Sequence, residues 1–281
     1  MKHRLCVILM ALVCLAGCAG EERKGALAEN GLTPVNVASV TEEGKAAFRQ
    51  KTDEIEAEKR AEEERKKKNP RGNYLIAIDA GHQAQGNSEK EPIGPGAAEQ
   101  KAKVAGGTRG VSTGTPEYEL TLQVSLKLRD ALEEKGYQVL MIRETNDVNI
   151  SNAERAIVAN DAGANAFIRI HADGSESSSA AGMMTICQTP SNPYNGAIYQ
   201  QSRALADCIL NQAVAATGAA KRNVWETDTM SGINWAQVPT TILEMGFMTN
   251  PSEDQQMAEE EYQEKIVEGI VRGMDAFFGV E

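Results

Sequence analysis

Short apolar runs alternate with amphipathic helical patterns from Tyr74 to the end of the chain. Five runs have the length and composition of buried strands, at residues 74–79, 137–143, 166–171, 183–188 and 240–244. Between or after them, apolar residues recur at helical spacing over 120–132, 153–162, 197–216 and 262–278. This alternation predicts a single α/β domain over 74–281, with a largely parallel mixed sheet covered by helices on both faces.

Histidines follow two of these predicted strands. His82 lies just past the first strand in LIAIDAGHQ (75–83), and His171 ends FIRIH (167–171). Ligand sites of such sheets lie outside the carboxyl ends of the strands. If the two strands are near each other, both histidines therefore project toward the same edge of the sheet.

Two convergent histidines indicate a metal site. A catalytic zinc typically takes three protein ligands, for example two histidines and a carboxylate, and leaves a fourth position for water. Glu117 fits the third place, because Thr115 is predicted as the N-cap and Pro116 as the first residue of the helix after a glycine-rich loop. The alternative is that Glu117 only favours the helix dipole from the first turn.

A further carboxylate follows the last apolar strand. Glu244 lies at the end of the run in PTTILEMG (239–246). A carboxylate beside a zinc-activated water is what general acid/base hydrolysis requires. The alternative is a structural glutamate paired with Arg169 or Arg143.

Four ordered motifs carry a resemblance to a known family. IDAGH (78–82), EYEL (117–120), IHAD (170–173) and LEMGFMTNP (243–251) resemble the zinc-dependent N-acetylmuramoyl-L-alanine amidases of bacterial cell-wall metabolism. The resemblance implies that His82, Glu117 and His171 bind zinc and that Glu244 is the catalytic acid/base. The implied substrate is peptidoglycan, cut at the amide between the lactyl group of muramic acid and L-alanine.

The chain departs from the family pattern at two places. Family members often have Gly-Gly where this chain has Gln83-Ala84, and often serine where it has Arg169. Both changes are expected to alter the rim of the cleft. The glycine- and proline-rich loop 83–115 is interpreted as contacting substrate, with a passive surface excursion as the alternative.

Three other functions compete with a zinc amidase. GVSTG (110–114) matches the G-x-S-x-G nucleophile elbow around Ser112, followed by Asp147 or Asp161 and then His171, but the polar residues before it do not read as the strand that an elbow requires. A zinc carboxypeptidase is disfavoured because Gln85 stands where its His-x-x-Glu pair would place the glutamate. The third alternative is a non-catalytic muropeptide-binding lipoprotein with the same fold.

The first residues have the pattern of an export signal. MKHRLCVILMALVCLAGC has basic residues at Lys2 and Arg4 and then an apolar run too short to span a bilayer. LAGC resembles the lipobox of bacterial lipoproteins, which implies a signal peptide over 1–17 and lipidation of Cys18. We therefore expect an exported protein that a lipid anchor holds to the outer face of the bacterial cell membrane.

Charge separates a tether at 18–73 from the domain at 74–281. Residues 19–73 carry twelve acids and twelve bases and the preceding segment two bases, so the total of −11 leaves −13 for the domain. Such an acidic domain is a poor candidate for binding nucleic acid.

Within the tether, a helix over 41–68 would span about 42 Å, ended by Asn69-Pro70-Arg71-Gly72. Cys187 and Cys208 could form one bridge or remain buried thiols, and the oligomeric state is left open.

Overall fold

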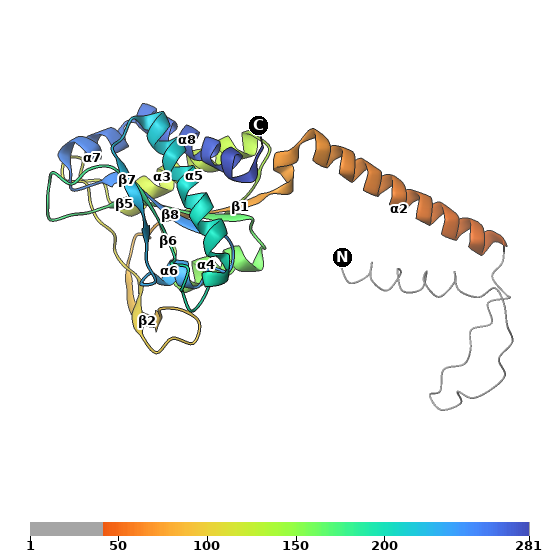
Figure 1. Cartoon of the computed structure of the whole chain (residues 1–281), viewed down its shortest axis with the longest axis horizontal. Coiled ribbons are helices and arrows are strands. Elements are labelled where there is room, and N and C mark those ends of the chain that lie inside the picture. The colour runs from red at the N-terminus through yellow and green to blue at the C-terminus, as the bar shows by residue number, and fades with distance from the viewer. Residues whose placement is uncertain (1–41, 281) are drawn as a thin grey trace. The chain divides into compact units, whose positions relative to one another are not determined.

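The computed structural model describes residues 42–280 (Figure 1). The predicted signal peptide at 1–17, Cys18 and the first part of the predicted tether lie outside the described residues. The contacts divide the chain between Ala57 and Glu58, so the two units are described separately. No helix among residues 42–280 is both long and apolar enough to cross a membrane.

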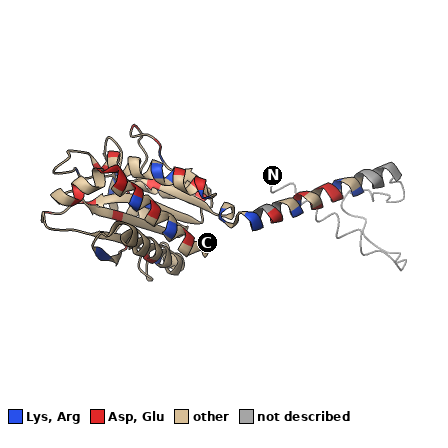
Figure 2. Cartoon of the chain, turned by 90° about the horizontal axis from the view of Figure 1, so that it is seen from above, with Lys and Arg blue, Asp and Glu red and all other residues tan. Residues whose placement is uncertain are grey.

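Helix α2 (Glu42–Lys68) agrees with the helix predicted over 41–68. Acidic and basic side chains alternate along it (Figure 2), as expected of a solvated helix. The helix ends before the 3₁₀ turn η2 (Pro70–Asn73), where the Asn69 side chain accepts a hydrogen bond from the backbone N–H of Gly72. The predicted stop at Asn69-Pro70-Arg71-Gly72 is confirmed.

A six-stranded mixed sheet forms the centre of the domain. Its strand order is β4-β1-β5-β8-β6-β7. All neighbouring strands are parallel except β6 and β8, which are antiparallel. The bounds are β1 (Leu75–Ala80), β4 (Gln138–Met141), β5 (Ala166–Asp173), β6 (Met183–Cys187), β7 (Lys221–Glu226) and β8 (Thr240–Phe247). The predicted α/β fold with a largely parallel mixed sheet is confirmed.

Helices cover both faces of this sheet because its central strands are apolar on both sides. Ile76, Ile78 and Ile170 point to one face, where they pack under α3 (Glu117–Glu134), α5 (Tyr199–Thr217) and α8 (Glu260–Phe278). Ala77 and Phe167 point to the other face, toward α4 (Asn152–Asp161) and α6 (Ser231–Asn234). Asp79, Arg169 and His171 share the α4 side by strand alternation.

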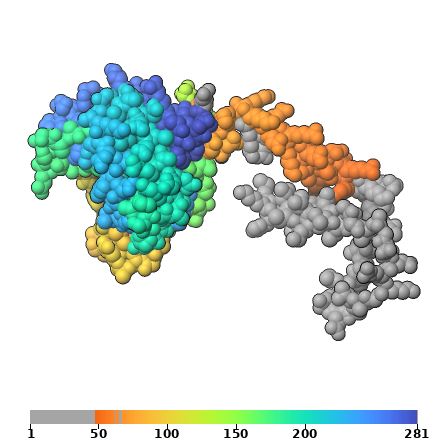
Figure 3. All heavy atoms as spheres, viewed as in Figure 1, coloured from red at the N-terminus to blue at the C-terminus, as the bar shows by residue number. Residues whose placement is uncertain are grey.

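The segment predicted as a loop over 83–115 contains an antiparallel hairpin. Its strands are β2 (Asn87–Pro92) and β3 (Gln100–Val104), and it projects from the domain as a lobe, yellow in Figures 1 and 3. The helix α7 (Pro251–Ala258) and the edge strand β7 were also not predicted. These strands are polar and partly exposed, so they lack the apolar runs by which buried strands are recognised. Cys187 and Cys208 are free thiols, and burial raises the pKa of Cys187 to about 12.

Candidate functional site

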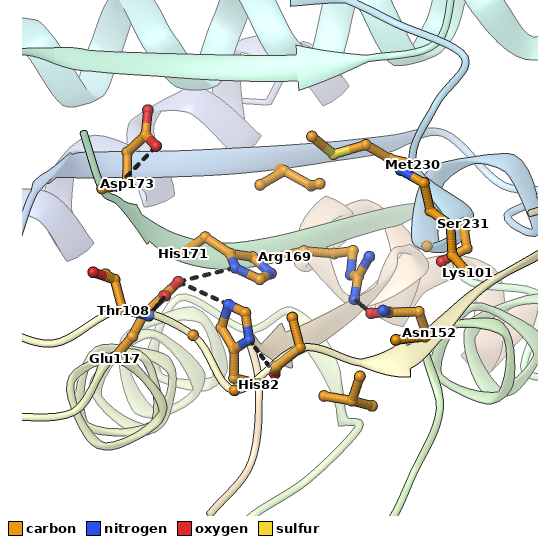
Figure 4. A pocket seen from close by; sticks show the side chains of 18 of the residues that line it. His82, Lys101, Thr108, Glu117, Asn152, Arg169, His171, Asp173, Met230 and Ser231 are labelled. Atoms are coloured by element: carbon orange, nitrogen blue, oxygen red, sulfur yellow. Dashed lines mark hydrogen bonds and ion pairs between the residues drawn. The ribbon is translucent and has the colours of Figure 1, made fainter. Parts of the chain in front are cut away.

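A cleft of about 760 Å³ opens at the carboxyl ends of β5 and β8, on the α4 side of the sheet (Figure 4). Strand alternation explains its floor: Arg169 and His171 are two residues apart on β5, and Ile242 and Glu244 are two apart on β8. His171 is the register partner of Glu244. The walls come from the β2–β3 hairpin and its following loop, from the start of α3 and from the segment at α6.

His82 stands on the turn that follows β1. Its φ of +61° is left-handed, an uncommon conformation for a residue with a side chain. Gly81 is required before it, because a Cβ there would overlap the His171 ring. The Arg155 guanidinium holds the His82 carbonyl at 3.0 Å, and the His82 Nδ1 lies 2.8 Å from the carbonyl oxygen of Ala105. These contacts direct the His82 Nε2 toward Glu117.

Glu117 is the first residue of α3. The N-cap is Pro116, so the prediction that Thr115 caps the helix and Pro116 begins it was wrong by one residue. The helix start is tied instead by the Glu117 N–H, which donates to the carbonyl of Thr108. The Glu117 side chain is buried, and it points back toward the two histidines.

The Glu117 carboxylate joins both histidines. Its Oε1 lies 3.1 Å from the His82 Nε2 and 3.1 Å from the His171 Nδ1. Its Oε2 accepts from the backbone N–H of Thr108 at 2.8 Å. Burial alone would raise the pKa of Glu117, but the hydrogen bonds with the two histidines hold it well below its usual range. Glu117 is therefore ionised and does more than complement the helix dipole.

The three side chains form a candidate metal centre. One ligand atom from each of His82, Glu117 and His171 lies within 4.8 Å of the others. Burial lowers the pKa of His171 to about 4, which leaves a neutral imidazole, the form that binds metals. The His171 Nε2 is buried and has no hydrogen-bond partner within residues 42–280. Burial would lower the pKa of His82, but its hydrogen bond with Glu117 raises it above the usual value. Two imidazoles and a carboxylate fit the donor set of a catalytic zinc.

Glu244 lies in the same cleft and forms no ion pair with any residue of the described part of the chain. Its Oε2 is buried without a hydrogen-bond partner there. Burial, with the charges of Glu117 and Asp173, raises the pKa of Glu244 well above its usual range. The alternative of a structural pair with Arg169 or Arg143 is wrong: Arg169 pairs with Asp79, and Arg143 donates to the carbonyls of Ala80 and Gly81.

A buried charge network supports the His82 turn, and its centre, Asp79, had no predicted role. Arg155 and Arg169 bind the two oxygens of this carboxylate at 2.7 and 2.8 Å. Burial would raise the pKa of Asp79, but the two arginines lower it to about 2. In the sequence, the sign of this role was an aspartate inside an otherwise apolar strand.

The two departures from the family pattern belong to this network. Gln83 accepts from the Arg155 guanidinium at 2.8 Å and from the backbone N–H of Ile150. Gln83 is buried and does not line the cleft, so its predicted position at the rim was wrong. Arg169 does line the cleft, from the floor and not from the rim.

The serine-hydrolase alternative finds no support in the geometry. Ser112 does not line the cleft. Its backbone N–H donates to Asp254 and its hydroxyl to the carbonyl of Pro251. Of the polar residues 101–109 that precede it, 101–104 belong to β3, contrary to the prediction, whereas 105–109 form no strand apart from a single bridge of Arg109 to Pro116. The elbow geometry that a serine nucleophile needs is missing here.

Comparison with known proteins agrees with the geometry. The profile of a family described as N-acetylmuramoyl-L-alanine amidase matches residues 76–276. YqiI of Bacillus subtilis is 33% identical over 168 residues, which are 60% of this chain and 77% of that protein. The N-acetylmuramoyl-L-alanine amidase Rv3717 of Mycobacterium tuberculosis is 28% identical over 218 residues, 74% of this chain and 87% of the relative. The crystal structure of the amidase Ami1 from Mycobacterium smegmatis superimposes with a TM-score of 0.67 at 28% identity, covering 73% of this chain and 97% of Ami1.

Proposed function

The chain belongs to the N-acetylmuramoyl-L-alanine amidase family, and from this premise we propose that it is a zinc-dependent peptidoglycan hydrolase. It would cleave the amide between the lactyl group of N-acetylmuramic acid and the L-alanine of the stem peptide. One observation carries the proposal: a three-residue metal-type cluster and an unpaired, buried carboxylate share a single cleft.

His82, Glu117 and His171 would hold the zinc ion. Zinc, when bound, supplies Lewis-acid polarisation of the scissile carbonyl and makes a water molecule nucleophilic near neutral pH. Backbone groups around the cluster orient its side chains. The carbonyl of Ala105 fixes the His82 ring, and the N–H groups of Thr108 and Ala172 hold the Glu117 carboxylate. Such outer contacts keep ligands in place before metal arrives.

Glu244 would move the proton. Its carboxylate accepts a proton from the attacking water and then gives it to the nitrogen of L-alanine as the carbon–nitrogen bond breaks. The products are a lactyl carboxylate and a free amine. A buried carboxyl with a raised pKa suits both steps, because it can gain and lose a proton at the pH of the reaction.

Digestion of peptidoglycan tests this function. The purified chain is expected to release stem peptides with a free N-terminal L-alanine and to leave glycan strands intact, as identified by mass spectrometry. Chelation should abolish release and added zinc should restore it. Products cut within the peptide or glycan would contradict the proposal, and binding without any release would favour the non-catalytic muropeptide-binding alternative.

We also propose that Cys18, which lies outside the described residues, carries a lipid anchor after export. Cys18→Ala is expected to move the protein from the membrane fraction to soluble or unprocessed forms, because the acyl chains supply the membrane affinity. Fractionation of cells followed by immunoblotting measures this. Cys14→Ala, four residues earlier, serves as the matched control. An unchanged membrane fraction for Cys18→Ala would rule out the anchor.

A further inference from the structure

Next to the cluster of His82, Glu117 and His171, the region below the cleft contains more buried arginines than carboxylates that pair with them. Arg155 and Arg169 are buried and share the single carboxylate of Asp79. Arg143, also buried, has only neutral partners. Of the other buried carboxylates, Glu91 accepts from the backbone N–H of Ala153 at the start of α4. Glu117 and Glu244 line the same cleft but form no ion pair with any of the three guanidinium groups within the described part of the chain. Positive charge in a water-poor region attracts anions strongly.

Arg169 carries this charge to the cleft. It is only 3% exposed, and its Nε and Nη2 bind Asp79 and Asn152. Its Nη1 has no hydrogen bond to any residue of 42–280 and lies against Gly232, where a Cβ would overlap it. Gly232 and Arg169 both line the cleft. Figure 4 shows the guanidinium beside the His82–His171 pair, on the side of Asn152 and Lys101.

The hairpin adds two more cations to the lining of the cleft. Lys90 and Lys101 line it, and neither forms an ion pair within the described part of the chain. By contrast Lys103, on the same strand, pairs with Glu89 at 2.8 Å. The Lys101 Nζ donates to the carbonyl of Thr229 at 2.5 Å, which holds the ammonium group in place and leaves two of its three N–H groups available.

The hairpin is fixed to the domain at the end where β2 turns toward β3. The Asn234 side chain donates to the carbonyl of Ile93, and the Trp235 indole N–H donates to the carbonyl of Pro92. These contacts hold β3, and with it Lys101, in the wall of the cleft whose floor contains Arg169. In a domain with a net charge of −13, unpaired lysines that line the same cleft as a buried arginine indicate a site for a negatively charged group of the substrate.

The proposed function limits which anion this is. In the stem peptide, the residue after L-alanine is a γ-linked glutamate, whose α-carboxylate is either free or amidated. One or two residues span about 4 to 8 Å, so this group lies close to the scissile nitrogen. We propose that Arg169 and Lys101 bind this carboxylate, so that the enzyme prefers stem peptides in which it is free. The inference rests on the proposed function and names the substrate form that the cleft selects.

Two muramyl peptides that differ only in this group, one with the carboxylate and one with the carboxamide, test the inference. The intact chain is expected to cleave the carboxylate form with a kcat/KM about 10- to 100-fold higher. Lys101→Gln should reduce the preference to less than about threefold, through a higher KM for the carboxylate form alone. Lys103→Gln, which removes a charge from the same strand outside the cleft, should keep the full preference.

The outcomes separate the two proposals. Equal cleavage of both forms by the unmodified chain would overturn the carboxylate site and leave the amidase function standing. An equal loss in Lys101→Gln and Lys103→Gln would also overturn the site, because it would indicate general charge attraction. Failure to cleave either form would overturn the amidase function itself. Thermal unfolding of each variant shows that the lysine changes leave the fold intact.

Discussion

Glu244→Gln is expected to lower turnover by about 10²- to 10⁴-fold, the contribution of general acid/base assistance, with the fold and the zinc content unchanged. Glutamine has nearly the same volume and can still form hydrogen bonds, but it cannot accept a proton from water and pass it to the leaving amine. Glu244 is also not one of the three clustered side chains that would hold the metal. The loss should therefore appear in kcat and not in metal binding.

Three measurements on one preparation decide the role of Glu244: elemental analysis for zinc, a binding isotherm for a muropeptide, and turnover. Glu176→Gln is the control, because Glu176 is exposed two residues beyond Gly174 at the cleft and loses the same charge. Near-normal turnover in Glu244→Gln would remove this residue from the mechanism. Lost zinc would make it a ligand instead.

The convergence of His82, His171 and Glu244 could be predicted from the sequence because each lies at or near the carboxyl end of a strand, whereas Glu117 comes from the start of a helix. His82 and His171 each follow an apolar run, and Glu244 lies in a third. The carboxyl ends of parallel strands meet at one edge of a sheet, so these three positions were expected to converge. Their convergence requires β1, β5 and β8 to be neighbours, which the observed order satisfies but no local pattern specifies.

The walls of the cleft could not be predicted in the same way. Strands β2 and β3 read NSEKEP and QKAKV, which are short and mostly polar, and the apolar positions Ala102 and Val104 are too few to predict a buried strand. They are held by pairing with each other. They are also held by side chains of α6 and of the residue after it, which lie 141 and 143 residues away in the sequence. The location of Lys101 depends on these long-range contacts. The same holds for Asp79, whose partners lie 76 and 90 residues further along the chain.

Asp79→Asn is expected to lower the free energy of unfolding by about 3 to 5 kcal/mol, the usual cost of removing one partner of a buried ion pair. Asparagine preserves the shape but leaves the buried Arg155 and Arg169 without a countercharge. Since a domain is stable by only about 5 to 15 kcal/mol, a large part of its stability depends on this carboxylate. Urea denaturation measures the change. Asp130→Asn, which breaks an exposed pair with Arg129, should cost at most about 1 kcal/mol.

Lowering the pH should weaken the interaction of Asp79 with the two arginines in the unmodified chain. The pKa of Asp79 is about 2 in the folded protein, below its ordinary value of 3.8. A lowered pKa means that the stabilisation is complete above pH 4 and is lost as the pH falls toward 2. Asp79→Asn has no such group, so the difference in stability between the two proteins should shrink over that range. A constant difference between pH 4 and pH 2 would mean that the charge of Asp79 is not what holds the two arginines.

Arg155 also binds the His82 carbonyl. Asp79→Asn should therefore bind zinc more weakly even where it remains folded.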